Sequence, residues 1–155
     1  TIWIIGEGIK KEYLKTQIEK HNLFNIKLLP YQDRKYMPAI NLFADFHFIA
    51  MDKSMENEGF PSKVYSIMAS GRSMVIVSSE NTPITSFLNE TGTSLLVTDH
   101  SLSGFKDALL KLAGNKKLRI SLGANGRKII EESYTKEKVI NQYTDLFEKI
   151  VSKKQ

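Results

Sequence analysis

The chain has 155 residues, of which 41% are hydrophobic and 25% are charged. This balance is typical of a water-soluble globular protein, and the length predicts a single domain over residues 1–155. No apolar run reaches the ~20 residues of a membrane span, and the absence of cysteine excludes disulfides and thiolate metal sites. Together these features favour a cytoplasmic protein.

The formal net charge is +5, and the basic residues are spread along the chain. Adjacent basic residues come only in pairs, such as Lys10 next to Lys11 and Lys116 next to Lys117. A nucleic-acid-binding protein is expected to carry a basic stripe or an arginine-rich block, so nucleic acid is not an expected partner. Diffuse positive charge is sufficient for peripheral association with an anionic membrane, and the sequence leaves that association open.

Apolar runs and helical patterns alternate along the chain. We predict strand 1–5, helix 11–21, strand 25–29, helix 36–43, strand 46–51, helix 61–70, strand 74–77, helix 82–89 and strand 93–97, and then helices from residue 101 onward. The last helical region is expected to break near Gly114 and again at residues 133–135. Continuous apolarity in the short runs is typical of strands covered on both faces of a parallel sheet. The pattern predicts a Rossmann-like, doubly wound α/β fold with C-terminal helices, which binds ligand at the carboxyl ends of its strands.

The densest chemical signal is EGFPSK, residues 58–63, between a predicted strand and a predicted helix. A glycine-bearing turn at a helix N-terminus presents free backbone N–H groups and the positive end of the helix dipole, which suit a phosphate. Gly59 permits close approach of the backbone, Ser62 offers a hydroxyl and Lys63 adds a positive charge. Glu58 would face sugar hydroxyls or a developing cation. The residues alone are equally compatible with an acidic loop and ordinary helix capping.

Residues 58–77, EGFPSKVYSIMASGRSMVIV, resemble the signature of the retaining, two-domain GT-B glycosyltransferases of the glycogen-synthase-like superfamily. The Gly-Phe-Pro-Ser-Lys variant is similar to the branch that assembles surface polysaccharides such as capsule, lipopolysaccharide O-antigen and colanic acid. Residues 4–8, 25–30, 89–97 and 118–134 resemble further family elements in the same order. The resemblance thus covers nearly the whole chain.

The resemblance implies a domain that binds a nucleotide sugar. It implies that Glu58 contacts the donor sugar as the catalytic residue and that the backbone of residues 59–62 holds the diphosphate. The loop at Tyr31 is the expected nucleobase position, although an ordinary loop is equally compatible with its residues. The expected nucleotide-sugar-binding residues are Gly59, Phe60, Pro61, Ser62, Lys63, Ser66, Tyr31, Gly6 and Gly8.

One position departs from the family pattern. The family usually places a second glutamate eight positions after the first, where it binds the ribose hydroxyls, and here that position is Ser66. A hydroxyl can donate or accept a hydrogen bond, but it cannot make the bidentate charged contact of a carboxylate. We therefore expect weaker or differently arranged recognition of the ribose.

Other chemistry-bearing side chains are scattered. Four acids, Asp45, Asp52, Glu56 and Glu58, could suggest a metal site, but their spacing matches neither an EF-hand loop nor a His–carboxylate cluster. The histidines are His21, His47 and His100. Because each occurs singly, and because His21 and His100 are predicted to be surface or loop residues, we expect neither a catalytic histidine nor a bound metal.

Two functions remain open from the sequence. The first is transfer of a sugar, with retention, from a nucleotide diphosphate sugar to a saccharide or lipid-linked acceptor. The commonest donor in the family is a UDP-sugar. In that case the chain is a donor-binding half that lacks the family's preceding strand and helix, with their basic phosphate clamp, and the N-terminal acceptor domain. It would be inactive alone. The alternative is a non-catalytic nucleotide-binding or interaction module, which Ser66 favours.

Overall fold

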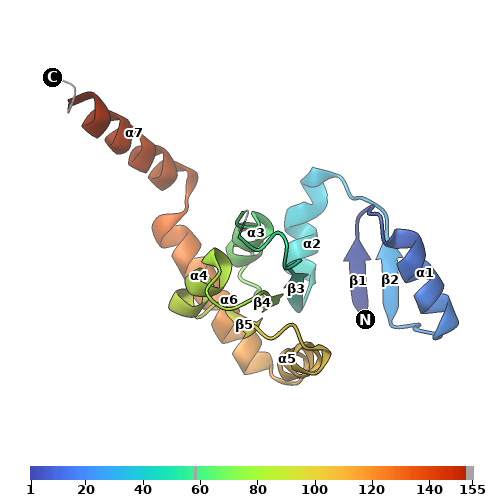
Figure 1. Cartoon of the computed structure of the whole chain (residues 1–155). Helices are drawn as coiled ribbons and strands as arrows, with labels where there is room; N and C mark the ends of the chain where they lie inside the picture. Colours follow the sequence, from blue (N-terminus) through green and yellow to red (C-terminus); the bar gives the residue numbers. More distant parts are fainter. Residues whose placement is uncertain (58, 153–155) are drawn as a thin grey trace. The chain divides into compact units, whose positions relative to one another are not determined.

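The computed structural model describes residues 1–57 and 59–152, so Glu58 lies outside the described residues. The chain folds as two compact units, Thr1–Ala39 and Ile40–Gln155. Figure 1 shows the elements of each unit coloured along the sequence.

Unit 1 is built on one parallel strand pair. Its elements are β1 (Ile2–Ile5), α1 (Lys11–Lys20), β2 (Ile26–Leu29) and the 3-10 helix η1 (Arg34–Tyr36). β1 and β2 pair in register from Ile2 opposite Ile26 to Ile5 opposite Leu29. Parallel pairing requires a crossover, and α1 makes it and packs against β2. The turn after β1 begins at Gly6, whose φ of +137° favours glycine and whose N–H donates to Leu29 O at 3.0 Å.

Unit 2 contains a three-stranded parallel sheet and most of the helices. The strands are β3 (Phe46–Ala50), β4 (Ser73–Val77) and β5 (Ser94–Val97), and they lie in the order β3-β4-β5. The helices are α3 (Lys63–Ala69), α4 (Pro83–Thr91), α5 (Leu102–Gly114), α6 (Lys116–Ser133) and α7 (Lys136–Ser152). The short helix α2 (Met37–Phe43) runs across the boundary between the two units.

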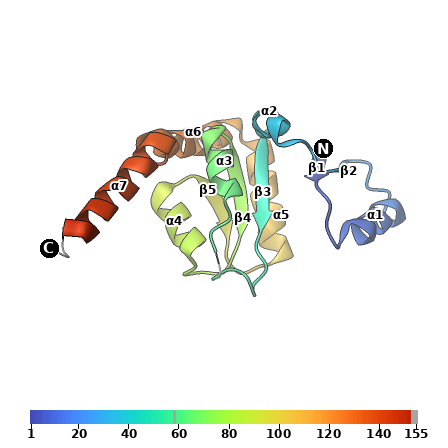
Figure 2. The same cartoon turned by 90° about the horizontal axis from the view of Figure 1, so that it is seen from above.

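The core of unit 2 lies on both faces of β4, all five residues of which are buried. On one face Met74 and Ile76 pack against side chains of α3 and α4, whereas on the other face Val75 and Val77 pack against α5 and Val97. Figure 2 shows the strands of this sheet between helices. A strand that is covered on both faces accounts for the continuous apolar run in its sequence.

Helix α6 crosses the turns that lead into β4 and β5. A Cβ atom added at Gly123 would lie 2.1 Å from Gly71 O, so only glycine permits this approach. Asn125 Nδ2 donates to Gly92 O at 3.0 Å, and Arg127 Nη1 donates to Ala69 O. These contacts occupy the amino-terminal edge of the sheet and leave the carboxyl edge to the loops that follow the strands.

The predicted fold class is confirmed, since parallel strands are flanked by helices. The predicted helix breaks also occur, because α5 ends at Gly114 and α6 ends at Ser133. Gly71, which follows α3, has a φ of +67°, as expected for a glycine that ends a helix. Within the described parts of the chain, no helix combines the length and the apolarity that crossing a membrane requires. The prediction of one domain over residues 1–155 stays a prediction.

Candidate functional site

The loops at the carboxyl edge of the unit 2 sheet carry a concentration of polar side chains. The described residues of these loops are 51–57 and 59–62 after β3, 78–82 after β4 and 98–101 after β5. In parallel α/β sheets, ligands bind outside the carboxyl ends of the strands. The edge is therefore the candidate site in unit 2.

Glu56 lies at the centre of this edge and is 3% exposed. One oxygen of its carboxylate, Oε1, accepts a hydrogen bond from the Ser79 N–H at 2.8 Å and lies 2.8 Å from His100 Nε2. His100 Nε2 also lies 3.2 Å from Ser79 Oγ. A single buried carboxylate thus joins the loops that follow all three strands.

The surroundings of Glu56 favour its ionised form. Burial of the carboxylate by itself would raise the pKa of Glu56, but hydrogen bonds from Ser79 and the neighbouring His100 lower that pKa below its ordinary value. A carboxylate only accepts hydrogen bonds, so His100 must present its Nε2–H to Glu56.

The described part of the β3–α3 loop is a turn organised by Asp52. Its Oδ1 accepts from Ser54 N at 3.0 Å and from Ser54 Oγ at 2.7 Å. Met55 N donates to Asp52 O at 2.9 Å, and Met51 N continues the sheet by donating to Val77 O at 2.9 Å. The turn directs the chain back toward the sheet at Glu56.

The β4–α4 loop is fixed by buried hydroxyl groups. Thr82 caps α4, and its Oγ1 lies 3.0 Å from Thr85 Oγ1 and 3.1 Å from Ser78 Oγ. Pro83 occupies the first turn of the helix, where the missing N–H has no cost. The capping box fixes where α4 begins and hence where the preceding Ser79 lies.

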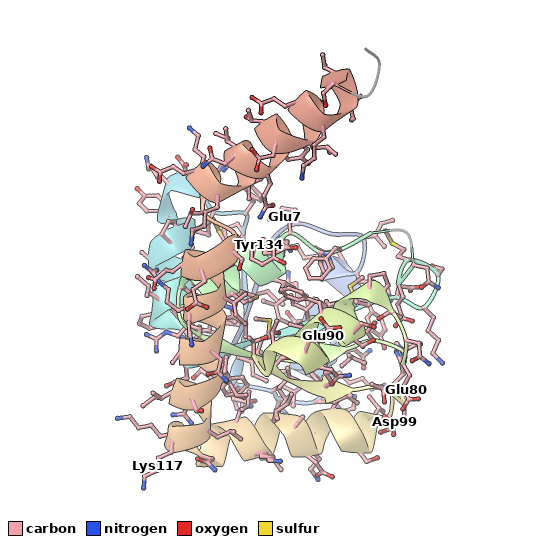
Figure 3. All side chains as sticks on the ribbon, turned by 90° about the vertical axis from the view of Figure 1, so that its left-hand side faces the viewer. Glu7, Glu80, Glu90, Asp99, Lys117 and Tyr134 are labelled. Carbon is pink, nitrogen blue, oxygen red and sulfur yellow. The ribbon has the colours of Figure 1, made fainter. Side chains whose placement is uncertain are left out.

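Two exposed acidic side chains lie on the outer rim of the edge. Figure 3 shows Glu80 and Asp99 near each other at the end where α5 begins, with Lys117 at the opposite end of that helix. Thr98 Oγ1 donates to Glu80 at 3.3 Å. The hydrogen bond from the Ser101 N–H is the main cause that lowers the pKa of Asp99. The exposed carboxyl group of Asp99 therefore carries a negative charge at neutral pH.

The motif residues around α3 have distinct environments. Gly59 is exposed, and the Phe60 ring packs 5.3 Å from the Phe87 ring. Ser62 precedes the first turn of α3 and makes no side-chain cap, and Lys63 is exposed at the start of the helix. Ser66, at the position of the expected ribose contact, donates from its Oγ to Lys63 O at 2.9 Å.

Gly6, Gly8 and Tyr31 belong to unit 1, where they lie at one edge of the strand pair. Gly6 and Gly8 follow β1, and Tyr31 follows β2 after Pro30 and is 74% exposed. Because β1 and β2 are parallel, the turn after β1 and the Tyr31 loop share the carboxyl edge of unit 1. The predicted site residues thus fall into two groups, one in each unit.

Sequence reasoning missed the contact between Glu56 and His100. His100 does lie in a loop, as expected, but its side chain is only 17% exposed. The sequence did carry one signal, which was the position of the two residues. Glu56 and His100 each follow a predicted strand, and the carboxyl ends of parallel strands meet at one edge of the sheet. In the part of the chain that the structure describes, no group of three or more His, Cys, Asp or Glu side chains could hold a metal ion.

Comparisons with known proteins find relatives that match most of this chain. A poly(ribitol-phosphate) alpha-N-acetylglucosaminyltransferase of Staphylococcus aureus (strain COL) is 26% identical over 145 residues, which are 93% of this chain and 28% of that protein. WcaI of Escherichia coli (strain K12), whose name assigns it to colanic acid biosynthesis as a glycosyl transferase, is 27% identical over 146 residues, which are 90% of this chain and 34% of that protein. The chain therefore spans about a third of the length of these relatives.

Solved structures show the same fold. The crystal structure of TarM matches with a TM-score of 0.74 and 23% identity, over 94% of this chain and 28% of TarM. Anabaena HepE, solved in complex with UDP, matches with a TM-score of 0.74 and 16% identity, over 98% of this chain and 41% of HepE. Residues 1–129 match the family model described as glycosyl transferases group 1, and the chain belongs to that family.

Proposed function

We propose that this chain is the donor-binding half of a glycosyltransferase of surface polysaccharide biosynthesis. In this proposal the enzyme transfers a sugar, with retention, from a nucleotide diphosphate sugar to a saccharide or lipid-linked acceptor. The observation that carries the proposal is that the family match over residues 1–129 includes the loop after β3, at the carboxyl edge of the sheet. The names of the two relatives support a role in building cell-surface polymers. In this proposal the enzyme works at the inner face of the cytoplasmic membrane.

The residues after β3 have the chemistry that donor binding requires. Glu58 holds the sugar hydroxyls in this proposal, and the backbone amides of residues 59–62 hold the diphosphate. Lys63, exposed at the start of α3, adds positive charge. Amides and a cation stabilise the leaving diphosphate as its charge develops, so the transfer needs no metal ion.

The donor is a UDP-sugar in this proposal, which the UDP complex of HepE supports. The turn at Gly6 and Gly8 and the loop at Tyr31 bind the nucleotide end of the donor. Ser66 contributes a hydroxyl to the ribose. Its bond to Lys63 O must break or be shared, which is consistent with weaker ribose binding than a glutamate would give.

A substitution at Glu58 in the complete protein tests the catalytic role. Glu58→Gln keeps the size of the side chain but removes its charge, so we expect turnover to fall about 100-fold. Transfer of radiolabelled sugar to acceptor measures the loss. Glu90→Gln, on the exposed surface of α4, is the matched control and should retain wild-type turnover. Equal turnover in the two variants would contradict the role of Glu58.

Nucleotide titration separates the enzyme from a non-catalytic binding module. Amide NMR of the complete protein with UDP, GDP and ADP should show shifts at residues 59–66 and around Tyr31 for one base. Binding without any sugar transfer by the wild-type protein would favour the binding module. A protein that neither binds a nucleotide nor transfers sugar would contradict the proposed function.

A further inference from the structure

We propose that Glu56, Ser79 and His100 form a polar clamp that positions the backbone of residues 59–62 for the donor diphosphate, with Glu56 and His100 as positioning residues. The role in donor binding rests on the proposed function, whereas the clamp itself is a property of the folded chain. It joins the loops after β3, β4 and β5 through one carboxylate. The three residues are called the clamp below.

The clamp is the inner attachment of an otherwise exposed loop. In the described segment 51–57, Glu56 is the one buried residue, whereas Met55 is 58% exposed. On the other side of Gly59, the Phe60 ring packs against Phe87 and Tyr65 at 5.3 and 5.1 Å. Glu56 and Phe60 are therefore both attached to other parts of unit 2. The clamp supplies the polar attachment and the aromatic rings supply the apolar one.

The chemistry of the attachment favours a carboxylate. Two donors, the Ser79 N–H and the His100 Nε2–H, converge on Glu56 Oε1 at 2.8 Å each. Hydrogen bonds to a charged acceptor are stronger than hydrogen bonds to a neutral one. Removing the Glu56 carboxylate would leave both N–H groups without this acceptor in a largely buried place, which costs free energy. The carboxylate is directed toward Ser79 and His100 within the same edge of the sheet.

The backbone at His100 matches this role. His100 has a φ of +54°, in the left-handed region that few non-glycine residues adopt. The preceding residue, Asp99, fixes the turn, because its carboxylate accepts a hydrogen bond from Ser101 N at 3.0 Å. The loop therefore directs the imidazole toward Glu56 from a constrained backbone.

Three variants of the complete protein test the clamp: Glu56→Ala, His100→Asn and the double variant. Asparagine tolerates the left-handed conformation, so His100→Asn removes the imidazole without imposing a new backbone strain. Asn125→Ala is the control, because it removes the hydrogen bond from Asn125 Nδ2 to Gly92 O at the amino-terminal edge of the sheet, opposite the edge that carries the clamp. Glu56→Gln keeps one acceptor oxygen and should partly rescue the loss.

Two measurements are made on each variant. Hydrogen–deuterium exchange of the free protein should show faster exchange at residues 51–62 in both single clamp variants, but not in Asn125→Ala. The KM for UDP-sugar should rise about tenfold, with the acceptor KM unchanged. The double variant should resemble one single variant, because both substitutions break the same contact.

The outcomes separate the clamp from the proposed function. Unchanged loop exchange in Glu56→Ala would overturn the clamp, whatever the activity. An equal rise of the donor KM in Asn125→Ala, or multiplicative effects in the double variant, would overturn the positioning role of the clamp. If the wild-type protein neither binds UDP nor transfers sugar, the proposed function fails, and the exchange measurement alone decides whether the clamp holds the loop.

Discussion

At the scale of single residues, His47 shows how burial sets a proton equilibrium. Its ring lies in β3 with Nε2 3.1 Å from Asn41 O. Burial is the main cause that lowers the pKa of His47 below its ordinary value of 6.5, and the charge of Arg72 lowers it further. The hydrogen bond to Asn41 opposes this shift and is outweighed. The folded protein therefore prefers the neutral imidazole.

This preference predicts a pH dependence of stability. At a pH well above the ordinary value of 6.5, His47 is neutral in both states and contributes no pH dependence. As the pH falls below that value, the unfolded chain takes up a proton that the folded chain resists, so the free energy of unfolding decreases. His47→Gln should flatten this dependence between about pH 7 and pH 5. Urea unfolding at each pH measures it, and parallel curves for the two proteins would contradict the shift.

The residue scale is also where prediction from sequence reached its limit. The EGFPSK motif could be found because its residues are contiguous. The clamp could not, because Ser79 is 23 positions from Glu56 and His100 is 21 positions from Ser79. Residues so far apart in the sequence form no motif with a recognisable spacing. They meet only because parallel strands end at one edge, and the strand order was not known from the sequence.

At the scale of elements, the sequence was informative because the signals are local. Pro83 and Thr82 mark the start of α4, and Gly92, with a φ of +58°, marks its end. Helix α3 spans only Lys63–Ala69, shorter than the predicted 61–70, since Pro61 and Ser62 precede the first helical turn. Apolar periodicity locates an element well but not its terminal residues.

The close approach of α6 predicts a large effect of one added methyl group. Gly123→Ala would place a Cβ 2.1 Å from Gly71 O, and a backbone atom cannot move aside as a side chain can. We expect a loss of about 3 kcal/mol in the free energy of unfolding, measured by urea denaturation.

Gly114→Ala is the matched control for this substitution. Nothing lies within 4 Å of a Cβ added at Gly114, which is the last residue of α5. Alanine should therefore be neutral there, or stabilising by about 0.5 kcal/mol, because it reduces the freedom of the unfolded chain. Similar losses at Gly114 and Gly123 would show that the effect at Gly123 does not come from its contact with Gly71.

At the scale of the whole molecule, burial is concentrated in unit 2 around β4. Helix α7 has no buried residue, although its sequence is amphipathic. Its exposed apolar side chains are Ile140, Tyr143, Leu146, Phe147, Ile150 and Val151. Helices gain most of their stability from packing an apolar face, so α7 gains little within this chain.

This distribution predicts a gradient of hydrogen exchange along the chain. Amides of β4 should exchange most slowly, because opening them requires disruption of both core faces. Amides of α7 should exchange fastest among the helices of unit 2. Exchange measured by mass spectrometry on this chain tests the order. Protection of α7 equal to that of β4 would mean that α7 packs against a surface of its own chain.

The order of the sheet in unit 2 also bears on how the protein is made. Each strand pairs with the next one along the chain, β3 with β4 and β4 with β5. We therefore expect the sheet to grow strand by strand as the chain leaves the ribosome. Helix α6 crosses the turns before β4 and β5, and it is synthesised after both of them. The nascent sheet should thus stay vulnerable to proteases and chaperone binding until α6 has emerged and closed it.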